Sequence, residues 1–238
     1  MELKGKRVVV TGGALRIGAK ISETFAKSGA EVVVHYRNSI SEAEKLVARL
    51  GGAEKRHSMF RCDFTEQAEL EEMAEKCFPA DILVNNASVF RAEPAISEDM
   101  RHFEEQFRVN FLAPLYLMKK FCATGGKLVI NILDERAAKL LPKEGSYELS
   151  KKSLLWATEV FAIQAAPETR VNAVAPGATL PPSGLPDSTM EEHRRKIPLR
   201  KTPAPEDVAE ACIYIARNDI ISGQTIFIDG GQHLVWTG

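Results

Sequence analysis

Short runs of β-branched and other apolar residues alternate with longer segments of helical periodicity along this chain of 238 residues. Because parallel strands are joined by crossover helices, this alternation predicts an α/β fold: a single-domain, Rossmann-like, doubly wound parallel sheet with helices on both faces. Residues 1–238 are expected to form one domain, since α/β domains of about 200 to 250 residues are common. The runs expected to form strands are Arg7–Val10, Glu31–Ser39, Met59–Phe64, Asp81–Val84, Leu128–Leu133 and Gln224–Ile228.

The composition is that of an ordinary globular protein, with 45% hydrophobic residues, 26% charged residues and a formal net charge of -1. A chain so close to neutrality gives no reason to expect a polyanionic partner, which argues against nucleic acid. The 4 cysteines are widely scattered without a Cys-x-x-Cys pair, which predicts no metal site and reduced thiols in a cytoplasmic protein. No stretch has the length and apolarity of a membrane span, and the amino terminus has no apolar signal region.

A glycine-containing turn, Thr11–Gly18, joins the first expected strand to a helix that Gly29 can end. Glycines here let the backbone approach a pyrophosphate, and the helix amino terminus offers unpaired N–H groups to it. Gly12 and Gly18 fit a Gly-x-x-x-Gly-x-Gly arrangement, but its middle glycine is replaced by Arg16. The Arg16 guanidinium can pair with a phosphate or point into a substrate site. A turn that binds no ligand is the structural alternative.

The end of the second expected strand is where dinucleotide-binding folds meet the adenosine ribose. An acidic residue there would accept a hydrogen bond from a free 2′-hydroxyl group, and residues 35–39 contain none. Arg37 and Ser39 can instead hold a 2′-phosphate, which favours NADP(H) over NAD(H). The alternative is that Arg37 is only a solvated loop residue. Ser41 and Glu44 then have the spacing of a capping box that opens the next helix.

Tyr147 and Lys151 lie four residues apart in a segment expected to be helical from about Ser146. The phenol and the ammonium therefore share one helix face, and a cation a few ångströms away lowers the pKa of a phenol. Asp134 lies thirteen positions before the tyrosine, at the end of an expected strand, where open parallel sheets place their ligands. Three titratable groups are thus expected to converge. The alternative for Tyr147 and Lys151 alone is an exposed helical pair that contributes little to stability.

Two further stretches place unusual side chains near the same edge of the expected sheet. Asn85–Ser88 and Phe90 follow the fourth expected strand, and Phe90 is either a core residue or an aromatic that faces the crevice. Asn110 lies within a helix expected from Met100 to Cys122. A polar group among apolar neighbours must find a partner, so Asn110 is a candidate functional residue.

In this order and spacing, the motifs resemble the short-chain dehydrogenase/reductase family over nearly the whole chain. Thr11–Gly18 is similar to the cofactor turn of that family, and Asn110, Tyr147 and Lys151 are similar to three members of its catalytic tetrad. The resemblance implies that NADP(H) is bound by Gly12, Arg16, Ile17, Gly18, Tyr36, Arg37, Asn38, Ser39, Asp63, Asn86, Ala87, Lys151, Pro176 and Gly177.

The fourth tetrad position carries Asp134, where the family usually has serine. An ionised carboxylate cannot donate a hydrogen bond to a carbonyl as a hydroxyl group does. Together with Arg16, Ser88 and Phe90, this departure resembles the pteridine reductase branch, which includes bacterial dihydromonapterin and dihydrofolate reductases. The resemblance implies an NADPH-dependent oxidoreductase that transfers hydride to a small-molecule pterin or folate, and it leaves open whether this is of the biopterin, dihydromonapterin or dihydrofolate type. The implied catalytic residues are Asp134, Tyr147, Lys151 and Asn110, and the implied substrate contacts are Arg16, Ser88, Phe90, Asp134 and Tyr147.

Two other functions stay open. A generic short-chain carbonyl reductase, acting on 3-oxoacyl or sugar substrates, needs a hydroxyl group near Tyr147, so Asp134 discriminates against it. A non-catalytic NADP-binding sensor would keep the fold and lose the chemistry, and the presence of Asn110, Tyr147 and Lys151 argues against that reading.

The last third of the chain carries two expectations. Residues 178–200 form either a substrate loop that closes as a lid or an ordinary surface connection. The helix expected from Tyr147 to Ala166 has apolar residues around much of its circumference, as helices at subunit contacts often do. Because the family usually assembles through equivalent helices, the resemblance implies a homotetramer.

Overall fold

The computed structural model describes residues 1–140, 144–181 and 188–235. Within these residues the centre of the molecule is a seven-stranded sheet in which all neighbouring strands run parallel, in the order β3-β2-β1-β4-β5-β6-β7. The predicted doubly wound parallel sheet is therefore confirmed. The strands are β1 (Arg7–Val10), β2 (Glu31–Tyr36), β3 (Ser58–Arg61), β4 (Ile82–Asn85), β5 (Leu128–Ile132), β6 (Arg170–Pro176) and β7 (Thr225–Ile228).

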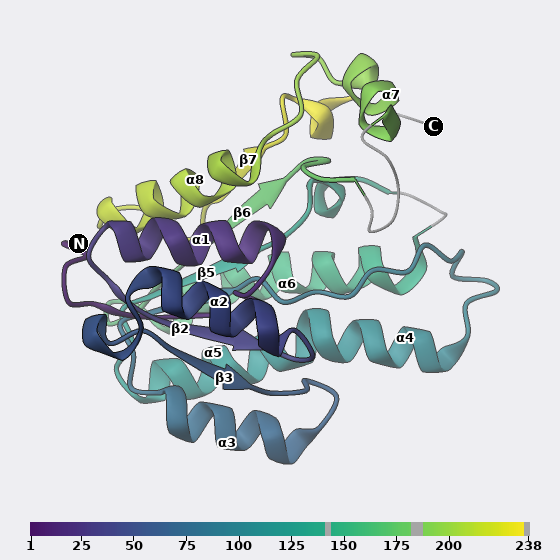
Figure 1. Cartoon of the computed structure of the whole chain (residues 1–238). Helices are drawn as coiled ribbons and strands as arrows, with labels where there is room; N and C mark the ends of the chain where they lie inside the picture. The colour runs from purple at the N-terminus through teal and green to yellow at the C-terminus, as the bar shows by residue number, and fades with distance from the viewer. Residues whose placement is uncertain (141–143, 182–187, 236–238) are drawn as a thin grey trace.

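Helices cover both faces of this sheet. They are α1 (Arg16–Lys27), α2 (Ile40–Leu50), α3 (Gln67–Cys77), α4 (Met100–Phe107), α5 (Ala113–Ala123), α6 (Gly145–Gln164), α7 (Ser188–Lys196) and α8 (Pro205–Arg217). In Figure 1, α1 lies beside α8 on one side of the sheet, while α3, α4, α5 and α6 gather on the other. Helix α7 stands apart from both layers, beyond the end of β6. Within the described residues, every helix is too short or too polar to cross a membrane.

The buried strands explain why the sequence reads as continuous apolar runs. In β1, Val8 and Val10 belong to the core under α1 and α8, whereas Val9 belongs to the core under α3 and α5. Successive side chains of a strand point to opposite faces, so a sheet covered on both faces needs apolar residues at every position. Helix α1 contributes Ile21 and Phe25, both fully buried, one turn apart on its inner face.

Strand β1 pairs with β2 on one side and with β4 on the other, so the chain switches direction along the sheet at this point. Open parallel sheets bind ligands outside the carboxyl ends of the strands at such a switch point. The candidate residues lie at or just after the ends of β1, β2, β3, β4, β5 and β6. The topology therefore brings them to one edge.

Three local features differ from the sequence-based expectations. The helix predicted from Met100 to Cys122 is interrupted by a π-helical turn, Arg108–Leu112, which contains Asn110. Such turns insert a residue into an α-helix and occur often at functional sites, but apolar periodicity does not reveal them. The predicted capping box is wrong, because α2 begins at Ile40 and Ser41 lies inside its first turn. Strand β6 was not among the predicted strands.

Candidate active site

The turn between β1 and α1 leaves the first helical N–H groups open to a ligand. Helix α1 has Leu15 at its N-cap with no side-chain capping bond, and its first turn contains no acidic residue. Gly12 has a φ of +60°, and a Cβ at this position would lie 3.0 Å from the Cα of Ala87. A Cβ at Gly18 would overlap the carbonyl oxygen of Gly12. An open helix end that the backbone can approach closely fits the pyrophosphate of a dinucleotide.

The residues after β4 hold this turn in place. The Asn86 side-chain amide donates hydrogen bonds to the carbonyl oxygens of Thr11 (2.9 Å) and Gly12 (3.1 Å). The backbone N–H groups of Asn86 and Ala87 donate to the Thr11 hydroxyl oxygen at 2.8 and 3.0 Å. In this structure Asn86 and Ala87 therefore shape the turn between β1 and α1 by joining the ends of β1 and β4.

Arg16 occupies a backbone conformation that favours glycine. Its φ is +52°, in the left-handed region, at the position where the glycine motif has its middle glycine. The guanidinium donates to the carbonyl oxygen of Pro181 at 2.9 Å. Its side chain lines a cavity shared with Phe90 and Tyr147. Of the two orientations considered from the sequence, the side chain adopts the one directed toward the candidate substrate cavity.

We expect the Arg16→Gly substitution to raise the KM for the substrate about tenfold while the free energy of unfolding changes by less than about 1 kcal/mol. Glycine relieves the strain of the left-handed backbone, which raises the free energy of unfolding by about 1 kcal/mol. Its greater entropy in the unfolded chain lowers that free energy by about the same amount. Steady-state kinetics and urea denaturation measure the two effects. Arg56→Gly is the matched control, since Arg56 also has a positive φ (+59°) but lies outside both described cavities of the strand-end crevice. An unchanged KM for Arg16→Gly would contradict the expected contact between Arg16 and the substrate.

His35, at the end of β2, is a residue of the site that the sequence patterns did not identify. Its Nδ1 accepts a hydrogen bond from the backbone N–H of Gly12 at 2.9 Å. The other nitrogen, Nε2, lies 2.9 Å from the carbonyl oxygen of Cys62 and must donate to it, so the tautomer is fixed. The ring stacks on Phe64 with centroids 4.5 Å apart. Burial lowers the pKa of His35 to about 4, so the imidazole is neutral and rigidly supports the glycine turn.

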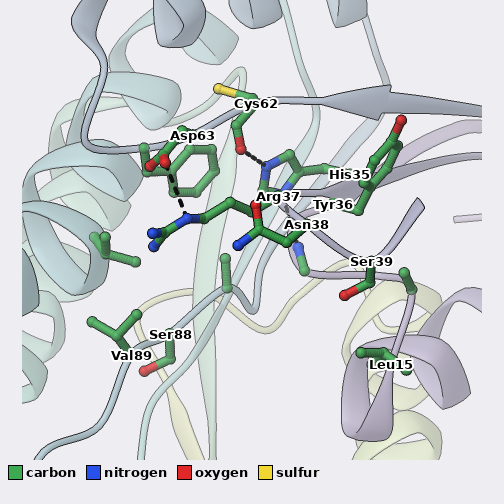
Figure 2. Close-up of a pocket in the computed structure, with 15 residues that line it drawn as sticks. Leu15, His35, Tyr36, Arg37, Asn38, Ser39, Cys62, Asp63, Ser88 and Val89 are labelled. Carbon is green, nitrogen blue, oxygen red and sulfur yellow. Dashed lines mark hydrogen bonds and ion pairs between the residues drawn. The ribbon is translucent and has the colours of Figure 1, made fainter. Parts of the chain in front are cut away.

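Figure 2 shows the cavity where the adenosine end of a dinucleotide would lie, lined by the ends of β2 and β3 and the loop after β4. Tyr36, Arg37, Asn38, Ser39 and Asp63 all line it, as expected for a cofactor site. The Arg37 guanidinium pairs with the Asp63 carboxylate at 3.0 Å, while the Ser39 hydroxyl lies on the other side of the cavity. The sequence predicted that Arg37 and Ser39 hold a 2′-phosphate; in this structure both line the same cavity, and Arg37 is paired with Asp63.

The end of β5 and the first turn of α6 bring a carboxylate and a phenol together. The Tyr147 hydroxyl donates a hydrogen bond to Asp134 Oδ2 at 2.8 Å. Asp134 Oδ1 accepts from the backbone N–H of Arg136 at 3.0 Å, which fixes the orientation of the carboxylate. Both side chains line the cavity that also contains Phe90 and Lys151. The predicted convergence of Asp134, Tyr147 and Lys151 is therefore present.

The electrostatics of this group differ from the expectation. Burial, followed by the charge of Asp134, raises the pKa of Tyr147 well above its ordinary value instead of lowering it. The Lys151 ammonium donates to the carbonyl oxygen of Ile132 at 3.0 Å and lies 5.8 Å from the centre of the Tyr147 ring. Burial lowers the pKa of Lys151 to about 8. The phenol therefore stays protonated at neutral pH and serves as a donor to Asp134.

An aromatic side chain forms one wall of the same cavity. Phe90 is 47% exposed and meets the Tyr147 ring edge to face, with centroids 4.7 Å apart. Its exposure excludes the core alternative considered from the sequence. Ile17, Ser88, Pro176 and Gly177 also line this cavity, so predicted residues from the ends of β1, β4, β5 and β6 meet in one cavity.

A family model described as enoyl-(acyl carrier protein) reductase matches residues 13–233. The chain belongs to the short-chain dehydrogenase/reductase family. A similar solved structure is FolM alternative dihydrofolate reductase 1 from Brucella canis complexed with NADP. It has a TM-score of 0.90 and 34% identity, covering 100% of this chain and 98% of that chain.

Two curated relatives differ in the substrates that their names state. D-threitol dehydrogenase from Mycolicibacterium smegmatis is 30% identical over 244 residues, covering 96% of this chain and 93% of the relative. Pteridine reductase 1 from Leishmania tarentolae is 26% identical over 281 residues, covering 95% of this chain and 96% of the relative. This short-chain dehydrogenase/reductase is therefore an oxidoreductase of a family that uses a nicotinamide cofactor, and the nature of its substrate depends on its own site.

The Asn110 side chain of this short-chain reductase is fully used within the protein. Its amide nitrogen donates to the Val89 carbonyl oxygen (2.9 Å) and to Ser150 Oγ (3.2 Å). Its oxygen accepts from Ser88 Oγ (3.0 Å) and the Val89 N–H (2.9 Å). Because an amide has two donors and accepts two bonds comfortably, these four contacts use the hydrogen-bonding capacity of the Asn110 side chain.

Arg136 and Glu144 also belong to the active-site surroundings, although no sequence pattern indicated them. The Arg136 guanidinium lies 5.3 Å from the centre of the Phe90 ring, 3.6 Å from Asp134 Oδ2 and 3.1 Å from Glu144 Oε2. Burial raises the pKa of Glu144 to about 7, although the charge of Arg136 opposes the shift. Arg136 therefore connects the aromatic wall with two carboxyl groups.

The predicted substrate loop, residues 178–200, is described only in part. Residues 182–187 of that loop lie outside the described residues. On either side of this gap, Thr179 and Leu180 before it and Met190 and His193 of α7 line the cavity with Tyr147. The described parts of the loop thus border the candidate substrate site.

Proposed function

We propose that this short-chain reductase uses NADPH to reduce a pterin ring of the biopterin, dihydromonapterin or dihydrofolate type. The observation that carries the proposal is the hydrogen bond from the Tyr147 hydroxyl to the Asp134 carboxylate at 2.8 Å. The similarity to a FolM alternative dihydrofolate reductase and to a pteridine reductase supports the same class of substrate.

The proposed reaction adds a hydride to a ring carbon and a proton to the neighbouring nitrogen of a C=N bond. Bound NADPH supplies the hydride. As the hydride arrives, the ring nitrogen becomes strongly basic and takes up a proton that the Tyr147 hydroxyl delivers through the Asp134 carboxylate, to which it already donates; solvent then reprotonates the phenolate. The nearby Lys151 ammonium favours the phenolate that is left. A carboxylate can pass a proton to a nitrogen that becomes basic in this way, whereas ketone reduction requires a group that donates a hydrogen bond to the carbonyl oxygen.

The flat shape of a pterin matches the walls of the cavity. Phe90 is exposed beside Tyr147 and offers an aromatic face on which a heterocycle can stack. Arg16 and Ser88 line the same cavity and can bind polar edges of the ring. Stacking would hold the accepting carbon in a fixed position, which is the main requirement for hydride transfer.

We infer a preference for NADPH over NADH. The end of β2 carries no carboxylate to bind a free 2′-hydroxyl group, and Arg37, Asn38 and Ser39 line the adenosine cavity. Arg37 is 3.0 Å from Asp63, so binding a 2′-phosphate would draw its guanidinium toward a second negative group. The FolM structure that resembles this chain is complexed with NADP.

The carbonyl reductase alternative requires a hydroxyl group beside Tyr147 in place of Asp134. Ser146 is adjacent in sequence, but it is fully buried and its hydroxyl bonds to Glu98. Ser88 Oγ already donates to Asn110 Oδ1. These contacts favour the pterin proposal over a ketone substrate. The alternative of a non-catalytic NADP-binding sensor gives no reason for the hydrogen bond between Tyr147 and Asp134, which therefore favours an enzyme.

The test is NADPH oxidation by the purified protein with biopterin, dihydrobiopterin, dihydromonapterin, dihydrofolate and two carbonyl compounds, with NADH in parallel. We expect turnover of pterins with NADPH only, and a loss of at least about 100-fold in the Asp134→Ser variant. Asp219→Ser, at a surface site, is the matched control. Turnover of carbonyls alone would overturn the proposal, and binding of NADPH without any turnover would support the sensor. Full pterin turnover by Asp134→Ser with an unchanged pH profile would remove the role of the carboxyl group.

We also propose that the enzyme is a homotetramer assembled through α6. Leu149, Trp156 and Ile163 are exposed apolar side chains spaced seven residues apart on this helix, so they lie on one face. Contact with another subunit would remove this face from water. Light scattering at micromolar concentration is expected to give a tetramer, and a stable monomer would contradict the assembly.

A further inference from the structure

The segment between β4 and α4 carries Phe90 and is held by one buried glutamine. Gln106 of α4 is 0% exposed. Its Oε1 accepts a hydrogen bond from the backbone N–H of Arg91 at 2.7 Å, and its Nε2 lies 3.4 Å from the Arg91 carbonyl oxygen. Arg91 directly follows Phe90, so this contact fixes the base of the aromatic wall.

The same glutamine holds the first turn of α6. Gln106 Nε2 donates to Ser146 Oγ at 2.7 Å and to Glu98 Oε1 at 3.1 Å. The backbone N–H of Ser146 donates to Glu98 Oε2 at 2.8 Å, and the Ser146 hydroxyl also bonds to Glu98. Glu98 thus caps α6 from a distant part of the chain. Ser146 directly precedes Tyr147.

We propose that Gln106 is a positioning residue that sets the geometry between Phe90 and Tyr147, which are the aromatic wall and the proton donor of the active site. Phe90 directly precedes Arg91, and Tyr147 directly follows Ser146; Gln106 bonds to both Arg91 and Ser146. The rings of Phe90 and Tyr147 are in contact, with centroids 4.7 Å apart. The inference rests on the proposed function, in which a flat ring stacks on Phe90 while Tyr147 and Asp134 supply its proton.

The chemistry of glutamine is what this position requires. One side chain must accept a hydrogen bond from a backbone N–H and also donate to a hydroxyl and to a carboxylate. The glutamine amide combines an acceptor oxygen with two N–H donors at the right length. In Gln106→Leu the size is similar, but the Arg91 N–H and the Glu98 carboxylate lose a buried partner. In Gln106→Glu the shape is kept, but the new carboxylate faces Glu98 and cannot donate when ionised.

The kinetic test measures kcat and KM for the pterin in Gln106→Leu, Phe90→Ala and the double variant. We expect kcat/KM to fall about 10- to 100-fold in Gln106→Leu, because small displacements of reacting groups are costly. NADPH affinity is expected to be unchanged. If Gln106 acts through Phe90, the double variant loses less than the product of the two single losses. Gln67→Leu on the surface of α3 is the matched control, since among the described residues the Gln67 side chain donates to Glu71 of the same helix.

A second test does not depend on the substrate. Hydrogen–deuterium exchange of Gln106→Leu is expected to speed up together in peptides covering residues 88–91 and 145–148, while Gln67→Leu changes neither. If the native protein turns over no pterin, the proposed function fails, and joint loss of protection still supports the coupling by Gln106. Normal pterin turnover in Gln106→Leu would overturn the positioning role. The role is also overturned if the kcat/KM losses of the two single variants multiply fully in the double variant and only one of the two segments, 88–91 or 145–148, exchanges faster.

Discussion

Replacing Tyr147 with phenylalanine is expected to lower kcat by about 10²- to 10⁴-fold, the usual contribution of a positioned proton donor. The hydroxyl donates to Asp134 Oδ2 at 2.8 Å, while the ring contacts Phe90 edge to face. Phenylalanine keeps the ring contact and removes only the hydroxyl, so the proton path through Asp134 loses its source. NADPH oxidation at saturating substrate measures the loss.

The control for this variant is cofactor binding, which a fluorescence titration with NADPH measures. The turn between β1 and α1 is held by Asn86 and His35 and does not depend on the Tyr147 hydroxyl, so we expect an unchanged affinity. Tyr214→Phe, an exposed tyrosine on α8, should leave kcat unchanged. A Tyr147→Phe loss smaller than about tenfold would show that another group supplies the proton.

Local patterns in the sequence were sufficient for every strand of the sheet except β6, and for part of the candidate active site. The run of valines in β1 predicts a strand buried on both faces, because a continuous apolar run can be recognised from adjacent residues alone. Asp134 and Tyr147 were expected to meet because one follows a parallel strand and the other begins the next helix. Their contact needs no information beyond strand ends and helical spacing.

The contacts that the sequence did not reveal join side chains far apart in the chain. His35 supports Gly12, and Gln106 supports Ser146, across 23 and 40 residues respectively. A buried histidine or glutamine in a single sequence carries no sign of its partner. The pKa of Tyr147 was predicted with the wrong sign for a related reason. Helical spacing gave the position of Lys151 but not the burial that dominates the shift.

Acidification from pH 7 to pH 4 is expected to lower the free energy of unfolding by about 3 kcal/mol through His35 alone. Burial lowers the pKa of this imidazole from 6.5 to about 4 in the native protein. The unfolded chain takes up the proton near pH 6.5, whereas the native protein does so only near pH 4. The stabilisation is therefore fully present above about pH 6.5 and is lost progressively as the pH falls toward 4.

The measurement is urea denaturation of the native protein and of His35→Gln between pH 7 and pH 4. The difference between the two stability curves isolates His35, because His57 and the carboxyl groups titrate in both proteins. We expect that difference to shrink by about 3 kcal/mol as the pH falls, and parallel curves would contradict the assignment. Protonation at Nδ1 would also turn the acceptor of the Gly12 N–H into a donor. The same pH range should therefore weaken NADPH binding in the native protein more than in His35→Gln, which links the stability of the fold to the cofactor turn.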